Sequence, residues 1–173
     1  MRTLSSVLND EQVLSSAGFS VDKLHRFWLM RRVGPGARVL VWCMLNPSKA
    51  GSQGDDPTIR RVTGFTRAFG YDVAVVVNLF SWRATEPRDC LTHLADASPH
   101  DNYRAVGEAA LDRDIVCAWG AHEWSREQAD AMIGSMHIVG ARLFHLGLSK
   151  HGMPRHPLML PKTATMVRWN GGF

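Results

Sequence analysis

The chain has 173 residues, of which 45% are hydrophobic and 21% charged, a composition that is ordinary for a globular protein. Its length favours a single domain over residues 1–173, and no apolar run approaches the roughly 20 residues of a membrane-spanning helix. The N-terminus shows no secretory signal pattern, so we expect a cytoplasmic protein without a membrane partner. Three cysteines without metal-binding spacing indicate reduced thiols and argue against a disulfide framework or a zinc site: Cys43, Cys90 and Cys117.

The net charge of +4 is unevenly distributed along the chain. Residues 23–67 hold nine Lys or Arg against two acids, and residues 131–173 hold five and no acid. Residues 86–130 hold ten acids against four arginines, and sixteen of the twenty basic residues are Arg. If the fold brings the two basic segments together, one face suits a polyanion, because Arg binds phosphate in a bidentate manner. The alternative is scattered, solvated charge without a binding role.

The beginning of the chain predicts a lead-in and a hairpin. Residues 1–20 indicate a short helical or irregular segment. Residues 24–32 mix apolar and aromatic residues with arginines, residues 38–45 are mainly apolar, and the Val-Gly-Pro-Gly stretch at 33–36 between them is typical of a turn. These two runs therefore predict an antiparallel hairpin.

A helix start follows the second run. Asp56 is a suitable N-cap and Pro57 a suitable first helical residue, after a loop that contains Gly51 and Gly54. The helix is expected to end at Gly70. Its apolar stripe consists of Ile59, Val62, Phe65 and Phe69.

The rest of the chain predicts, in order, a buried strand at 72–80, a helical piece at 89–95, a helix from Pro99 capped by Ser98, a strand at 115–120, a helix at 123–137, a strand at 142–147 and an irregular end. Strands that alternate with helices indicate an α/β fold. We expect a three-layer α/β/α sandwich with a central, mainly parallel four-stranded sheet, plus an N-terminal antiparallel strand.

Polar residues follow three of the predicted strands, at the point where each strand ends. They are Asn46-Pro47-Ser48, the stretch from Asn78 to Arg83, and His156-Pro157. The carboxyl ends of parallel strands share one edge, where open α/β sheets bind ligands. Each cluster has a plainer explanation, because Asn often forms turns, a single His is often structural and Arg is usually solvated. Their coincidence at one edge is what indicates a site.

The residue types at this edge suit one kind of chemistry. An Asn can hold a water through its oxygen, a His can donate to an oxygen that gains negative charge, and a second Asn can pair with a base edge. Together these functions fit cleavage of an N-glycosidic bond, in which the sugar becomes positive and the base leaves as an anion. The chain lacks the serine-elbow, P-loop and dinucleotide motifs, and a metal held by Asp55, Asp56 and His156 has no spacing in its favour. We therefore expect no metal and no cofactor.

The order of the clusters resembles that of the uracil-DNA glycosylase superfamily. Leu45-Asn46-Pro47 resembles the motif of mismatch-specific glycosylases, in which the Asn positions the attacking water. The segment from Asn78 to Arg83 resembles one in which an Asn reads the base, and His156-Pro157 resembles the loop whose His stabilises the departing base. Most of the chain also resembles an uncharacterised bacterial and phage family with Asn-Pro-Ser, Asp-Asp-Pro-Thr and Pro-Arg-His-Pro-Leu segments.

The resemblance implies a monomeric DNA glycosylase that flips a modified pyrimidine out of DNA and leaves an abasic site, with hypermodified phage bases and antiviral defence as an attractive role. The expected catalytic residues are Asn46, His156 and Asp56, although Asp56 is most simply a helix cap. The expected substrate-binding residues are Pro47, Ser48, Asn78, Phe80 and Phe65. The expected DNA-binding residues are Arg60, Arg83, Arg155, Lys150 and Leu158.

The chain also departs from the superfamily pattern. Ser48 stands where the mismatch enzymes have Gly, and residues 57–59 stand where the superfamily has a stacking aromatic, so we expect Phe65 or Phe80 to stack on the base. The His-Pro loop lacks the second Ser-Pro, which leaves Leu158 or Met159 as the wedge that enters the duplex. These departures suggest a base other than uracil. The alternatives are a hydrolase of free nucleotides and a nucleic-acid-binding module without catalysis.

Overall fold

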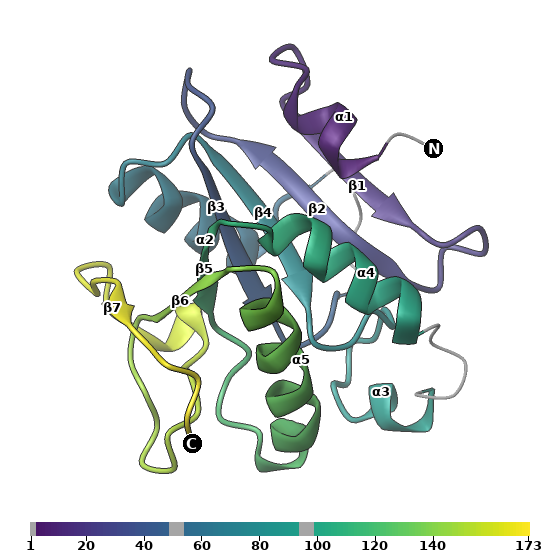
Figure 1. The fold of residues 1–173 in the computed structure, drawn as a ribbon, viewed down its shortest axis with the longest axis vertical. Helices are drawn as coiled ribbons and strands as arrows, with labels where there is room; N and C mark the ends of the chain where they lie inside the picture. Colours follow the sequence, from purple (N-terminus) through teal and green to yellow (C-terminus); the bar gives the residue numbers. More distant parts are fainter. Residues whose placement is uncertain (1–2, 49–53, 94–98) are drawn as a thin grey trace.

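The structure is a computed structural model that describes residues 3–48, 54–93 and 99–173. Seven strands of these residues form one sheet in the order β1-β2-β4-β3-β5-β6-β7 (Figure 1). The four neighbours β4, β3, β5 and β6 are parallel, and the outer pairings are antiparallel. The strands are β1 Ser15–Phe19, β2 Arg26–Arg32, β3 Val39–Met44, β4 Val73–Asn78, β5 Asp114–Cys117, β6 Arg142–His145 and β7 Val167–Arg168.

The predicted parallel sheet is confirmed at each of its four strands. The apolar runs at 38–45, 72–80 and 142–147 contain β3, β4 and β6, and the run at 115–120 overlaps β5, which begins one residue earlier. β4 is buried at every position, because it lies inside the sheet with both faces covered. The arrowheads of β3 and β4 point to the same edge in Figure 1, which is the edge where the polar clusters were expected.

The predicted hairpin between residues 24–32 and 38–45 is wrong in its pairing. β2 and β3 run antiparallel, but β4 lies between them and pairs with both. The turn that joins them is held by Asp72, whose carboxylate accepts hydrogen bonds from the backbone N–H groups of Gly36 at 3.0 Å and Arg38 at 3.1 Å. Asp72 directly precedes β4, so the turn is attached to the strand that separates β2 from β3.

The predicted lead-in contains more regular structure than its sequence indicated. Helix α1, Leu4–Leu8, begins after Thr3, whose side chain accepts a hydrogen bond from the Ser6 N–H. β2 is the predicted N-terminal antiparallel strand, and β1, which was not predicted, pairs with its outer edge. The sheet therefore extends further on this side than expected.

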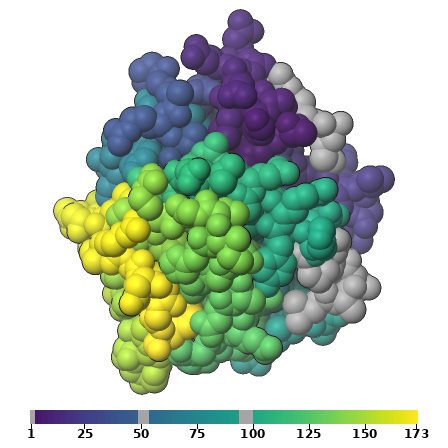
Figure 2. Space-filling model, in the orientation of Figure 1, coloured from purple at the N-terminus to yellow at the C-terminus, as the bar shows by residue number. Residues whose placement is uncertain are grey.

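Helices cover both faces of the sheet, which confirms the predicted three-layer arrangement. Helix α2, Pro57–Ala68, buries Ile59, Val62 and Phe65 against one face. Helices α4, Pro99–Ala110, and α5, Arg126–Ile138, cover the other face together with α1 (Figure 1). Figure 2 shows the C-terminal segment, in yellow, lying beside α5 on that side of the molecule.

Most local signals in the helices are confirmed. Gly70, with φ of 78°, follows the C-cap of α2 as predicted, and the apolar face expected for α5 is buried. The helical piece expected at 89–95 is α3, Asp89–Thr92, whereas Gly51 and the predicted cap Ser98 lie outside the described residues. All three cysteines are buried free thiols, and burial raises the pKa of each. Within the described ranges, no helix has the length and apolar character needed to cross a bilayer.

Candidate functional site

A cavity of about 250 Å³ lies at the edge of the sheet where the parallel strands end. It is smaller than the roughly 300–1,000 Å³ of pockets for drug-sized ligands, which suits a ligand of about one ring system. Five residues predicted from the sequence line it: Asn46, Ser48, Asp56, Asn78 and His156. The other lining residues are Arg26, Met44, Leu45, Thr58, Ile59, Val76, Pro87, Trp119 and His122. The three polar clusters therefore meet in one cavity.

Asn46 is fixed by its amide nitrogen. This nitrogen donates to the carbonyl of Ala84 at 3.0 Å and to that of Pro47 at 3.3 Å. The Pro47 carbonyl in turn accepts from the Ala84 N–H at 3.1 Å, so the loops after β3 and β4 are joined. Because the nitrogen is engaged, the side-chain oxygen of Asn46 is the atom left to accept a hydrogen bond, for example from a water. Pro47 itself is buried and does not line the cavity.

Asn78 ends β4, and two helices hold the backbone around it. The side-chain nitrogen of Asn102 on α4 donates to the carbonyls of Asn78 and Leu79, at 3.1 Å each. The side-chain nitrogen of Gln128 on α5 donates to the Leu79 carbonyl at 2.9 Å. The side chain of Asn78 is 1% exposed, and neither its nitrogen nor its oxygen has a partner within the described part of the chain. Asn78 thus offers a donor and an acceptor side by side.

His156 lies on a loop that is tied to α2. Arg61 donates from Nε to the carbonyl of Pro157 at 3.3 Å, and from its terminal nitrogen to that of Leu160 at 2.6 Å. On the other side, Gly120 has φ of 92°, and a Cβ added there would lie 3.8 Å from the His156 Cβ and 3.3 Å from the His122 ring. A glycine therefore allows the chain after β5 to pass close to both histidines.

The protonation of His156 follows from its contacts. Its Nδ1 accepts a hydrogen bond from the Leu158 N–H at 3.3 Å, which leaves the proton of a neutral ring on Nε2. Burial lowers the pKa of His156, and the nearby His122 lowers it further, while Asp56 opposes both. The ring is therefore a neutral donor through Nε2 at neutral pH, the form that stabilises a developing anion without carrying charge itself.

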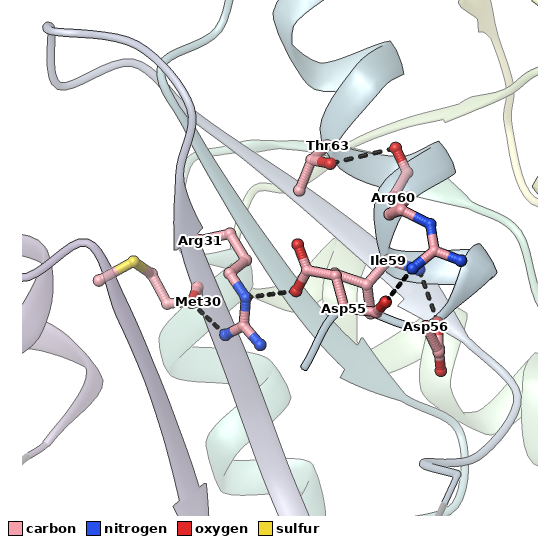
Figure 3. Close-up of polar contacts among 7 residues, drawn as sticks. All are labelled: Met30, Arg31, Asp55, Asp56, Ile59, Arg60 and Thr63. Carbon is pink, nitrogen blue, oxygen red and sulfur yellow. Dashed lines mark hydrogen bonds and ion pairs between the residues drawn. The ribbon is translucent and has the colours of Figure 1, made fainter. Parts of the chain in front are cut away.

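Asp56 has the structural role expected of a helix cap and also lines the cavity. One carboxylate oxygen accepts from the Ile59 N–H at 2.8 Å and the other from the Ser48 hydroxyl at 3.1 Å. The neighbouring Asp55 lies between two arginines (Figure 3): its carboxylate pairs with Arg31 Nε at 2.8 Å, and its carbonyl accepts from the Arg60 guanidinium. Asp55 is thereby engaged in joining α2 to β2.

Arg26 is a cavity residue that the sequence interpretation missed. Phe19 of β1 pairs with Arg26, whereas Gly18 pairs with Trp28, so Phe27 is left without a partner. An extra residue of this kind reverses the alternation of side chains along a strand. Trp28 consequently packs into the core on the α4 and α5 side, while Arg26 lines the cavity. Arg26 is 6% exposed, and burial lowers the pKa of its guanidinium to about 10, with Asp56 opposing the change.

The expected stacking aromatics lie elsewhere. Phe65 is buried on the α2 side, where it packs on Trp42 and Phe69, and Phe80 packs on Trp124 with 5.7 Å between ring centroids. Neither of these two predicted residues lines the cavity, because both side chains are used in core packing. The lining includes another aromatic residue, Trp119, which follows β5 and is 0% exposed. Its position at the end of a predicted strand was the signal that could have identified it.

The predicted DNA-binding residues are spread around the cavity rather than inside it. Leu158 and Met159 are exposed and, with Arg155, line a second hollow of about 490 Å³ that shares His122 and His156 with the cavity. Lys150 is exposed in the preceding loop. Arg60 and Arg61 line another hollow together with Lys162, so the two basic segments of the chain do meet there. Arg83 donates to the Lys23 carbonyl at 2.8 Å and lies over the Phe19 ring.

Among the described residues, no group of three or more His, Cys, Asp or Glu side chains is placed to hold a metal ion. Asp56 and His156 both line the cavity, but Asp55 is bonded to Arg31. The side chains that line the cavity include hydrogen-bond donors and acceptors such as Asn46, Asn78 and His156.

No curated protein and no solved structure matches this chain. The model of one protein family matches residues 26–158, which is most of the chain and includes every residue that lines the cavity. The matched range also contains the Asn-Pro-Ser, Asp-Asp-Pro-Thr and Pro-Arg-His-Pro-Leu segments. The chain therefore belongs to the family described as Protein of unknown function (DUF1643).

Proposed function

We propose that this protein is a DNA glycosylase that hydrolyses the N-glycosidic bond of a modified pyrimidine flipped out of DNA. The observation that carries the proposal is the convergence of Asn46, Asn78 and His156 on one cavity of about 250 Å³. Their free atoms fit the three tasks of the reaction, namely holding a water, pairing with the base and donating to the leaving group. We further propose that the protein acts as a monomer in the cytoplasm.

In the proposed step, water attacks C1′ of the sugar as the bond from C1′ to the base nitrogen breaks. The electron pair of that bond leaves with the base, and the water proton passes to solvent, so the products are an abasic sugar and a base anion. The Asn46 nitrogen stays bonded to the carbonyls of Ala84 and Pro47, and the Asn46 oxygen accepts a hydrogen bond from the water. The Nε2–H of His156 donates to a base oxygen as negative charge develops on it. The Asp56 carboxylate stabilises the positive charge that develops on the sugar.

The surroundings of the cavity provide the parts needed for a duplex. Leu158 and Met159, 44% and 67% exposed, are apolar side chains beside His156 and serve as the wedge that takes the place of the flipped nucleotide. Arg155 and Lys150 lie on the same loop segment and contact phosphates. Attack on hypermodified phage DNA is the biological role that this substrate class suggests.

Incubation with modified duplexes tests the proposal. Duplexes that carry uracil, 5-hydroxymethyl or glucosylated pyrimidines are treated with the protein, and abasic sites are revealed by alkaline strand cleavage. We expect product from at least one duplex, and a loss of about 10²–10³-fold in rate for Asn46→Ala or His156→Ala. Arg104→Ala, which changes an exposed residue of α4 away from the cavity, is the control and should retain the full rate. Absence of abasic sites on all these duplexes, and on DNA from phages with modified bases, contradicts the proposal.

The same experiment separates the two alternatives. Release of a base from a mononucleotide but not from DNA identifies a hydrolase of free nucleotides. Salt-sensitive DNA binding that Asn46→Ala leaves unchanged, with no product from either protein, identifies a binding module.

A further inference from the structure

Buried polar atoms without a hydrogen-bond partner are concentrated at the cavity. Within the described ranges there are six such side-chain atoms, and four of them belong to cavity-lining residues: Arg26 Nε, Asn78 Nδ2, Asn78 Oδ1 and Trp119 Nε1. A fifth, Asn102 Oδ1, belongs to the side chain that holds the Asn78 backbone. Because buried polar groups in native proteins are normally bonded, this concentration indicates a ligand that supplies the missing partners.

Arg26 shows which chemistry the ligand brings. Its guanidinium forms no ion pair with any residue that the structure describes, although Arg31, five positions along the same strand, is paired with Asp55 at 2.8 Å. With a pKa of about 10, Arg26 still carries its charge at neutral pH. A guanidinium has only donors, arranged to bind two oxygens of one planar group. A buried cation of this kind is strongly favoured by a negatively charged acceptor.

The depth of these groups shows which end of the ligand meets them. Arg26, Asn78 and Trp119 are 6%, 1% and 0% exposed, so only the inserted end of a ligand reaches them. His122, by contrast, is exposed and is shared with the neighbouring hollow, so it lies at the mouth. In a flipped nucleotide the inserted end is the base, and the backbone phosphates remain at the mouth.

We propose that the inserted end of the ligand carries an oxyanion, such as a carboxylate on the pyrimidine ring, and that Arg26 binds it. Asn78 then pairs with the ring beside the oxyanion, and the Trp119 N–H supplies a further donor. The assignment rests on the proposed function in taking the ligand to be a base. The phosphate of a free mononucleotide offers the same chemistry from a second source.

Calorimetric titration of the purified protein measures this preference directly, without any turnover. The probes are uracil-5-carboxylate, its neutral isostere uracil-5-carboxamide, and uridine 5′-monophosphate. The variants are Arg26→Gln, Arg26→Lys, which keeps the charge if the first variant folds poorly, and the control Arg104→Gln on the exposed face of α4. Circular dichroism checks the fold of each variant.

We expect the wild type and Arg104→Gln to bind the carboxylate about 10–100-fold more tightly than the carboxamide, as for a charge-assisted pair of hydrogen bonds. Arg26→Gln should abolish the difference, and Arg26→Lys should retain part of it. Tighter binding of the mononucleotide, lost in Arg26→Gln, supports the oxyanion site and identifies phosphate as the source. Equal binding of carboxylate and carboxamide by the wild type overturns the inference, as does a preference that survives in Arg26→Gln.

Failure of this inference can be told apart from failure of the proposed function. Abasic sites formed on a neutral base at equal rates by the wild type and Arg26→Gln leave the glycosylase proposal intact and reject the oxyanion. An oxyanion preference without abasic sites on any duplex supports the oxyanion site and rejects the glycosylase proposal.

Discussion

Replacing Arg26 by Met is expected to make the free protein more stable while removing its affinity for an anionic ligand. Met has a similar length and no charge, so it fills the same space at the end of β2 without a buried cation. The guanidinium that it replaces is 6% exposed and has no ion pair among the described residues. A stabilising substitution at a polar position is the behaviour expected of a residue kept for binding.

The magnitude follows from the pKa of Arg26. A decrease from an ordinary value of 12.5 to about 10 corresponds to a cost of about 3 kcal/mol for holding the charged form in the folded protein. This cost is present at all pH values below the lowered pKa and is relieved only at strongly alkaline pH. This net cost already includes the opposing attraction to Asp56. We therefore expect Arg26→Met to raise the free energy of unfolding by about 1–3 kcal/mol, and Tm by about 2–4 °C per kcal/mol.

Arg31→Met is the matched control, because Arg31 lies on the same strand and is also buried. Its guanidinium is bonded to Asp55 at 2.8 Å and to the Met30 carbonyl at 2.9 Å. Its loss should lower the free energy of unfolding by about 1–3 kcal/mol. Urea unfolding at pH 7 measures both variants. A loss of more than about 1 kcal/mol in Arg26→Met, similar to that in Arg31→Met, refutes the reasoning, since it shows that Arg26 stabilises the free protein.

Two further predictions concern the loop that carries His156. Arg61→Ala removes the hydrogen bonds to the carbonyls of Pro157 and Leu160. We expect the free energy of unfolding, measured in urea, to fall by about 1–3 kcal/mol and amide exchange at 158–160 to become faster. The control is Arg67→Ala, at the exposed end of α2, which should leave that exchange unchanged. Folding lowers the pKa of His156 below its ordinary value of 6.5. Between these two pKa values the unfolded chain binds more protons than the folded protein, so His156 lowers the free energy of unfolding as pH falls through this window. Above 6.5 the residue is neutral in both states and has no such effect. The difference in free energy of unfolding between the wild type and His156→Gln, measured in urea over a pH series, should therefore be constant above pH 6.5. Below pH 6.5 the wild type should lose stability relative to the variant. A difference that stays constant over the whole range contradicts the assigned protonation.

The sequence was sufficient to predict the parallel strands and the convergence of the polar clusters, because both depend on local signals. An apolar run identifies a buried strand, and the first polar residue after it must lie at the carboxyl edge. Asn46 and Asn78 could be placed for this reason, since β3 and β4 are adjacent and Met44 lies opposite Asn78. His156 could be placed because its loop follows β6 in the same sheet.

Arg26 could not be placed, because its position depends on two non-local features. The strand that carries it pairs with β4 rather than with β3, so its neighbours differ from those of the predicted hairpin, although the antiparallel direction was predicted correctly. The unpaired Phe27 then decides which face Arg26 meets. The supports of Asn78 escaped notice for a similar reason. Asn102 and Gln128 lie on helices whose sequences show only an amphipathic pattern, and nothing local indicates that their side chains bond the end of β4.

The structural and catalytic interpretations of Asp56 are compatible with each other. By capping α2 and accepting from Ser48, its carboxylate is fixed in the wall of the cavity, so a negative charge is held there by bonds that also stabilise the helix. Arg26 is held by a different element, β2, and the two side chains form no ion pair, so opposite charges remain separate around one small cavity. Separation of this kind is unfavourable in the empty protein. It suits a reaction in which a bond between sugar and base breaks, because the sugar then becomes positive and the base negative, and each fixed charge meets the opposite one.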